Sequence, residues 1–192
     1  YQRRVRGMQV VNKSFFDIKS VDTGEKSLEL VNVRQIDNIQ HIQNLQNLQH
    51  LRIQANLQFF KLQIHLQKVI ELNLSKNRLV DIQGVRCMPF LQKLNIGQNL
   101  LPSAQLLHLE LLQDLKYLNV SYNQMDNDPK LELKLARVIP GIEEVKYQGE
   151  DQGQKFIKGR VDAVSPTEYI RSLFKMAKFT DPFSKIERAS IK

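Results

Sequence analysis

The fold of this chain is decided by one stretch, which reads Val69-Ile70-Glu71-Leu72-Asn73-Leu74-Ser75-Lys76-Asn77-Arg78-Leu79. Its pattern is an apolar residue, two variable positions, Leu-x-Leu, two more variable positions and then Asn-x-Leu. The same pattern returns at residues 91–101 and 115–125, at offsets of 22 and 24 residues. A recurring period of this length indicates a stack of similar structural units.

Weaker copies flank these three on both sides. The copy before them has Gln58 where an apolar residue belongs, so we expect Phe59 or Phe60 to fill that place. A degenerate copy at 28–48 has apolar residues at every third position from Ile36, which predicts 3₁₀ turns. A terminal copy covers 142–147. The consensus positions of the copy at 48–58 are Leu48, Leu51, Ile53 and Asn56.

Each copy predicts one short parallel strand whose alternate residues point inward. The strands are expected around residues 72–74, 94–96 and 118–120. Asn77, Asn99 and Asn123 follow at the turns, where a buried amide can bond backbone groups that no strand satisfies. We expect these asparagines to form a ladder along the stack. The apolar residues expected behind the strands are Ile82, Val85, Leu106, Leu109 and Leu112.

The repeats resemble the short, intracellular class of leucine-rich-repeat proteins over residues 28–148, and most strongly over 69–125. That class includes the nuclear regulatory subunit of protein phosphatase 1, the leucine-rich light chain of axonemal outer-arm dynein and a leucine-rich spliceosomal subunit. The resemblance implies an α/β leucine-rich-repeat solenoid with a curved parallel sheet and about five to six repeats. One repeat cannot bury its own apolar face, whereas a stack can.

Residues 129–147 resemble the C-terminal cap of that class. Asp128 is expected to N-cap a helix that Pro129 opens and that ends near Pro140 and Gly141, and a last strand follows. The expected organisation has three parts. Residues 1–27 are a basic N-terminal extension and cap, residues 28–148 are the repeat domain with its C-terminal cap, and residues 149–192 are a linker followed by a basic amphipathic helix tail.

The tail has a helix signal of its own. Ser165-Pro166-Thr167-Glu168 combines an N-cap, a proline at the first helical position and a glutamate at N3, which is a capping box. Amphipathic spacing after it allows the helix either to fold back onto the solenoid or to dock a partner, with a membrane surface as a weaker third option. The predicted partner contacts of the tail are Tyr169, Arg171, Phe174, Lys175 and Lys178.

Charge and cysteine content bear on the partner and the compartment. The net charge is +8, and +6 of it lies in residues 1–27 and 148–192, so the middle of the chain is nearly neutral. Basic tails favour an acidic partner surface, either protein or nucleic acid. A single cysteine favours a reducing compartment, because secreted domains of this size usually carry paired cysteines. The sequons that begin at Asn12, Asn73 and Asn119 are therefore interpreted as chance.

Two further signals concern targeting. No stretch approaches the roughly 20 apolar residues that span a bilayer. The sequence starts at Tyr1 rather than at a methionine, and Arg3, Arg4 and Arg6 fit either the remnant of a targeting segment or a basic contact arm. We expect an intracellular protein of the cytoplasm or cytoskeleton, with the cilium as one such setting.

No residues suggest catalysis. None of the four histidines (His41, His50, His65 and His108) has cysteine, aspartate or glutamate at a metal-ligand spacing, and no phosphate loop or nucleophile elbow is present. Residues 126–128 are similar to a calcium loop but lack its glycine and closing glutamate. Cys87 is interpreted as a small core residue. The sequence therefore predicts no enzyme, no metal site and no cofactor.

Strand alternation predicts the binding surface on the concave side of the sheet. One row of outward residues is His50, Glu71, Lys93, Tyr117 and Glu144, a second is Glu29, Arg52, Asn73, Asn95, Asn119 and Lys146, and a third is Gln54, Ser75, Gly97 and Ser121. The predicted partner contacts are His50, Arg52, Glu71, Asn73, Lys93, Asn95, Tyr117, Asn119 and Tyr122. Tyr117 and Tyr122 are the anchor candidates, since tyrosine is enriched at hot spots.

The preferred function is a non-catalytic interaction scaffold or adaptor in a multi-subunit assembly. A cytoskeletal or axonemal setting is preferred by analogy with the dynein light chain, and an acidic surface such as tubulin would suit the basic tails. Two alternatives remain open at this stage, also by analogy. One is an RNA-linked, spliceosome-like subunit, and the other is a phosphatase regulatory subunit.

Overall fold

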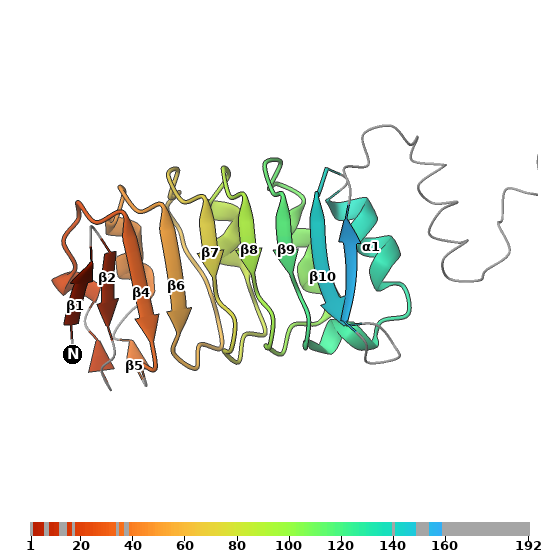
Figure 1. The fold of residues 1–192 in the computed structure, drawn as a ribbon, viewed down its shortest axis with the longest axis horizontal. Coiled ribbons are helices and arrows are strands. Elements are labelled where there is room, and N and C mark those ends of the chain that lie inside the picture. The colour runs from red at the N-terminus through yellow and green to blue at the C-terminus, as the bar shows by residue number, and fades with distance from the viewer. Residues whose placement is uncertain are drawn as a thin grey trace, which may run out of the picture.

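The computed structural model shows a stack of repeats with a sheet along one side and short helical turns along the other (Figure 1). It describes the backbone of residues 2–5, 8–11, 15–16, 18–33, 35–36, 39–139, 141–148 and 154–158. Side chains are described for 18–33, 39–139 and 141–147. The strands lie side by side along the longest axis of the molecule, from the N-terminal end to β10 (Figure 1).

Within the described part of the chain, one nine-stranded sheet has the order β1-β2-β4-β6-β7-β8-β9-β10-β11. Neighbours from β2 to β10 pair in parallel, while β1 and β11 pair antiparallel at the two ends. The bounds are β1 Gln2–Val5, β2 Met8–Val11, β4 Ser27–Val31, β6 His50–Gln54, β7 Glu71–Asn73, β8 Lys93–Asn95, β9 Tyr117–Asn119, β10 Glu144–Gln148 and β11 Gln154–Lys158. A second, two-stranded sheet pairs β3 (Phe15–Phe16) with β5 (Gln35–Ile36) in parallel.

Short helical turns connect the strands behind this sheet. In the described part of the chain, five are 3₁₀ helices: η1 Ile18–Ser20, η2 Ile39–Asn44, η3 Gln83–Cys87, η4 Ser103–Leu109 and η5 Gln124–Asn127. One α-helix, α1 (Leu131–Val138), precedes β10. The 3₁₀ turn at η2 confirms the expectation drawn from the apolar spacing of three, because residues i and i+3 eclipse in such a turn.

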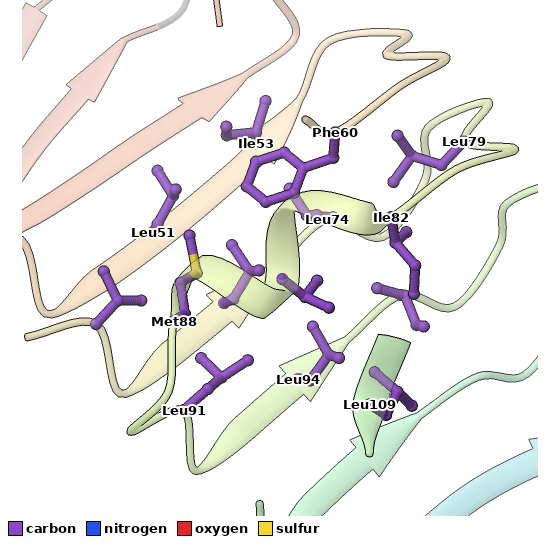
Figure 2. Close-up of a cluster of buried hydrophobic side chains, with 14 of the residues drawn as sticks. Leu51, Ile53, Phe60, Leu74, Leu79, Ile82, Met88, Leu91, Leu94 and Leu109 are labelled. Atoms are coloured by element: carbon purple, nitrogen blue, oxygen red, sulfur yellow. The ribbon is translucent and has the colours of Figure 1, made fainter. Parts of the chain in front are cut away.

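The core lies between the sheet and these turns. Figure 2 shows Leu51, Ile53, Leu74 and Leu94 from the sheet side facing Phe60, Ile82, Met88 and Leu109 from the returning segments. The five apolar residues predicted behind the strands are all buried, with at most 3% exposure. Burial of each such side chain contributes roughly 1.5–3 kcal/mol. The leucine-rich-repeat solenoid and its parallel sheet are thereby confirmed.

The asparagine ladder is confirmed. Each ladder side chain, Asn77, Asn99 or Asn123, donates to two backbone carbonyls. One belongs to the inward-facing residue at the end of the strand segment of its own repeat, and the other to the equivalent residue of the preceding repeat. Each also accepts a backbone N–H from the preceding repeat, as Asn99 does from Leu79 at 3.0 Å. All three are at most 8% exposed. The ladder therefore satisfies, across repeat boundaries, polar groups that the strands leave unpaired.

The copy at 48–58 departs from the prediction at its asparagine. Asn56 is exposed and has φ 53°, which is the conformation of Lys76, Gln98 and Tyr122, the residues directly before the ladder asparagines. The ladder therefore ends at Asn77, whose Oδ1 accepts from the Ala55 and Leu57 N–H groups. Of the two phenylalanines proposed to replace Gln58, Phe60 is the buried one, whereas Phe59 is 51% exposed.

The helix and the last strand predicted for the C-terminal cap are present as α1 and β10, but the start of the helix differs from the prediction. Helix α1 begins at Leu131, and Asp128 is not its N-cap, because the Asp128 carboxylate instead accepts the Lys130 N–H and the Lys134 ammonium. The linker expected from residue 149 contains β11, which extends the sheet beyond β10. The predicted tail helix, with its proposed contacts from Tyr169 to Lys178, lies outside the described residues.

Candidate protein-binding face

The solvent-facing side of strands β4 and β6 to β10, called the sheet face below, carries two of the three rows predicted from strand alternation. The third row differs from the prediction, because Ser121 is only 2% exposed and Gly97 is also buried. Strand pairing aligns His50, Glu71, Lys93, Tyr117 and Glu144 in one row. It aligns Glu29, Arg52, Asn73, Asn95, Asn119 and Lys146 in the next. The structure thus brings these side chains together on one surface, and their role in partner binding stays a prediction.

The first row has paired groups at its start and an exposed cation in its middle. The His50 Nδ1 lies 3.1 Å from Glu71 Oε2. Lys93 follows on the next strand and is exposed, and its side-chain ammonium makes no hydrogen bond or ion pair to any described residue. Partial burial, and secondly the nearby Glu144 carboxylate, raise the pKa of Tyr117 above its ordinary value. Its hydroxyl is therefore protonated, and able to donate, throughout the neutral pH range.

The second row has a charge pair at one end and three asparagines in its middle. Arg52 donates to Glu29 Oε1 at 2.7 Å. The side-chain oxygen of each of the three asparagines accepts a hydrogen bond from the backbone N–H two residues later in the chain. Asn73 accepts from the Ser75 N–H at 3.0 Å and hydroxyl at 2.7 Å, and Asn119 accepts from Ser121 at 3.1 and 2.7 Å. Asn95 accepts from the Gly97 N–H at 3.2 Å.

Gly97 makes room for this arrangement. A Cβ at this position would lie 3.1 Å from Oδ1 and 3.2 Å from Nδ2 of Asn119 on the neighbouring strand. The corresponding positions of the flanking repeats hold Ser75 and Ser121. The missing side chain therefore leaves the Asn119 amide in place at the middle of the sheet face.

Tyr122 lies apart from the rows. It occupies the left-handed turn position before Asn123, with φ 60°, and its side chain is 44% exposed. It is thus accessible at the turn that follows β9, at one end of the strand rather than on the pleated surface. The structure therefore separates the two tyrosines that the sequence grouped as anchors.

The residues behind the sheet form a second polar cluster that the sequence did not indicate. Lys61 pairs with Asp81 at 3.0 Å, and Asp81 also accepts the Gln83 N–H. Burial, and secondly the charge of Arg86, lower the pKa of His108. Arg86 Nε and His108 Nδ1 are buried without a partner among the described residues. The cluster joins segments that lie 20 or more residues apart in the sequence, so no local motif could predict it.

The remaining candidate groups have structural partners. Cys87 packs against the core, and burial raises its thiol pKa, which disfavours the reactive thiolate. Asp126 accepts the Asn123 N–H in a capping box. Among the described residues, no group of three or more His, Cys, Asp or Glu side chains could hold a metal ion. None of the described helices has the length and apolar character that crossing a membrane requires.

Comparisons with known proteins give structural likenesses only. No protein-family model and no curated protein matches the chain. Internalin C2 from Listeria monocytogenes is similar with a TM-score of 0.49 and 20% identity, over 65% of this chain and 52% of that one. An internalin (inlF) from the same organism is similar with a TM-score of 0.48 and 24% identity, over 66% of this chain and 36% of that one. The fold assignment itself rests on the strand register and the ladder.

Proposed function

We propose that this chain is a non-catalytic interaction subunit that binds a protein partner on its sheet face. The observation that supports this is the alignment of two rows of polar and aromatic side chains across consecutive parallel strands, each of them exposed or partly exposed. A solenoid presents such a surface without changing its core, because the inward and outward residues of each strand are independent.

The charge of the sheet face favours a protein over a nucleic acid. Its two rows hold three basic residues, Arg52, Lys93 and Lys146, and three acidic residues, Glu29, Glu71 and Glu144. Nucleic-acid affinity depends on several lysines and arginines that neutralise phosphates together. A surface of mixed sign instead matches a protein partner, where alternating charges fix the register of docking.

The setting that we propose is an intracellular multi-subunit assembly of the cytoplasm or cytoskeleton, including an axonemal one. It is supported by the resemblance of residues 69–125 to the short intracellular repeat class and by the single cysteine. The basic charge outside the repeat body would add attraction to an acidic protein surface such as that of tubulin.

Crosslinking mass spectrometry of the tagged full chain in native cell extract tests the proposal. The expected result is a reproducible protein partner crosslinked through Lys93 and Lys146. A variant with Glu71, Lys93 and Tyr117 all changed to alanine should lose most of that partner. The matched control changes three residues behind the sheet, Gln83, Leu107 and Glu110, and should retain it. Recovery of free monomer alone, or equal loss in both variants, would refute the proposal.

A further inference from the structure

The three asparagines of the second row, Asn73, Asn95 and Asn119, direct their Nδ2 donors rather than their Oδ1 acceptors toward solvent. Backbone N–H groups can only donate, so the atom within hydrogen-bonding distance of the Ser75, Gly97 and Ser121 N–H groups must be the asparagine oxygen. The Nδ2 group of each amide therefore points elsewhere. No described residue accepts a hydrogen bond from these three Nδ2 groups, and all three side chains are partly exposed.

The acceptor capacity of these side chains is largely used. The oxygens of Asn73 and Asn119 each accept two hydrogen bonds from the serine that follows, which fills both lone pairs. The neighbouring carboxylates each have one oxygen in a contact, Glu29 Oε1 with Arg52 and Glu71 Oε2 with His50. The asparagine row itself therefore presents mainly hydrogen-bond donors to solvent.

Lys93 and Tyr117 add to this set. They are aligned with each other in the first row and stand two residues before Asn95 and Asn119 on the same strands, so all four side chains emerge on one side of the sheet. The Lys93 ammonium supplies a positive charge that makes no ion pair with any described carboxylate. The Tyr117 hydroxyl supplies a donor that stays protonated.

We propose that this donor patch, consisting of Asn73, Lys93, Asn95, Tyr117 and Asn119, binds the carboxylate side chains of an acidic segment of the protein partner. This proposal rests on the proposed function, since it assumes that a protein binds the sheet face, and it specifies that the bound groups are carboxylates. Carboxylates offer only acceptors, and hydrogen bonds to an ionised group are shorter and stronger than neutral ones. One cation among neutral amides matches a carboxylate better than a phosphate backbone, which requires several cations.

The geometry limits where the acidic segment lies. Adjacent strands are about 4.8 Å apart, so the donor patch spans roughly 10 Å from Asn73 to Asn119. Glu144 stands one strand beyond Tyr117, and Glu71 stands beside Lys93 on β7, so both would repel a carboxylate placed over them. The acidic segment is therefore expected between them, along the asparagine row, with its carboxylates nearest Lys93 and Asn95.

Asparagine-to-aspartate substitution tests the donor patch with little change to the fold. Aspartate keeps the oxygen that accepts the turn N–H but replaces the Nδ2 donor with a second, negatively charged acceptor. The test variant is Asn73→Asp/Asn95→Asp/Asn119→Asp. The charge-matched control is a triple variant at exposed asparagines off the sheet face, Asn44→Asp/Asn47→Asp/Asn127→Asp. Circular dichroism establishes that both variants are folded.

The probe is a fluorescently labelled glutamate-rich peptide, measured by anisotropy against matched glutamine-rich and lysine-rich peptides and a single-stranded oligonucleotide. The unsubstituted protein should bind the glutamate-rich peptide at least about tenfold more tightly than the others, which is a difference of about 1.4 kcal/mol. The test variant should lose this preference, and the control should keep it.

The outcomes separate this proposal from the proposed function. No preference for the glutamate-rich peptide, unchanged binding by the test variant, or tighter binding of the oligonucleotide would each overturn the carboxylate assignment. If the protein partner from cell extract still crosslinks to Lys93 while any of these results holds, the protein-binding face stands and only its ligand chemistry is wrong. If the unsubstituted chain recovers no crosslinked partner from cell extract, the proposed function itself is refuted.

Discussion

Asn99→Ala should cost less stability than Asn77→Ala, although both side chains are buried members of the same ladder. The reason is that neighbouring ladder asparagines share their carbonyl acceptors. The Leu74 carbonyl accepts from Asn77 at 2.8 Å and from Asn99 at 3.0 Å, and the Ile96 carbonyl accepts from both Asn99 and Asn123 at 3.0 Å. Removal of the middle asparagine therefore leaves both carbonyls with a partner.

The magnitudes follow from counting the groups that each substitution orphans. Asn99→Ala leaves one buried donor, the Leu79 N–H, at a cost of about 2 kcal/mol. Asn77→Ala leaves the Ala55 and Leu57 N–H groups and removes the only ladder donor to the Ile53 carbonyl, at a cost of about 4 kcal/mol.

Urea unfolding followed by far-ultraviolet circular dichroism measures both free energies, with the slope m checked for two-state behaviour. Asn95→Ala is the matched control, because this asparagine is partly exposed and accepts only the Gly97 N–H, so its loss should cost less than about 1 kcal/mol. If Asn99→Ala costs as much as Asn77→Ala, the sharing argument is wrong. If both cost no more than the control, the ladder does not stabilise the stack.

Three further predictions concern the folded body. A side-chain hydrogen bond from Lys134, and secondly one from Ser103, lowers the pKa of Asp128 from its ordinary 3.8 to about 2. The ionised Asp128 carboxylate therefore stabilises the fold above pH 4, and this contribution is lost as the pH falls toward 2. Because Lys134 is 44% exposed, Asp128→Asn should cost only about 1–2 kcal/mol of unfolding free energy at pH 7. The variant should also show a weaker fall of the unfolding free energy below about pH 4, as measured by unfolding at a series of acid pH values. Gly84→Ala should cost about 1–3 kcal/mol in urea unfolding, since the new Cβ would meet the Phe60 carbonyl at 2.6 Å, and an unchanged midpoint would contradict this packing. Gln98→Gly should raise the thermal midpoint, because it relieves about 1 kcal/mol of strain at φ 56°, and a fall in midpoint would contradict the strain.

The sequence predicted the rows of the sheet face because two regularities fix them. Strand alternation decides which residues point outward, and the repeat period decides which residues stand side by side. Both regularities are local or periodic, so they can be counted along the chain. The same holds for the ladder, whose asparagines keep a constant offset from the strand leucines.

The direction of the asparagine amides could not be predicted in the same way. It depends on the side-chain rotamer and on the turn that follows. From the sequence alone, Asn73-Leu74-Ser75 and Asn119-Val120-Ser121 are interpreted as chance glycosylation patterns. In the structure, the N–H and the hydroxyl of each serine donate to the oxygen of the asparagine two residues before it. A repeated Asn-x-Ser or Asn-x-Gly at the end of each strand was the available signal.

Features that depend on distant partners were also missed. The choice of Phe60 over Phe59 depends on space beneath Gly84 in the next repeat, and the strand β11 depends on pairing with β10. Asp128 was assigned to the helix start because its sequence position fits an N-cap, but the Lys134 ammonium reaches the same carboxylate. Such competition between partners is decided in three dimensions.

The central claim, that the sheet face meets the partner, is tested most directly by nuclear magnetic resonance of the asparagine side-chain amides. The labelled protein is titrated with the partner recovered by crosslinking. The Nδ2 resonances of Asn73, Asn95 and Asn119 should shift or broaden, while those of the buried ladder residues Asn77 and Asn99 should not. The claim would be contradicted if the face resonances stayed unchanged while signals from η3 and η4, behind the sheet, moved instead.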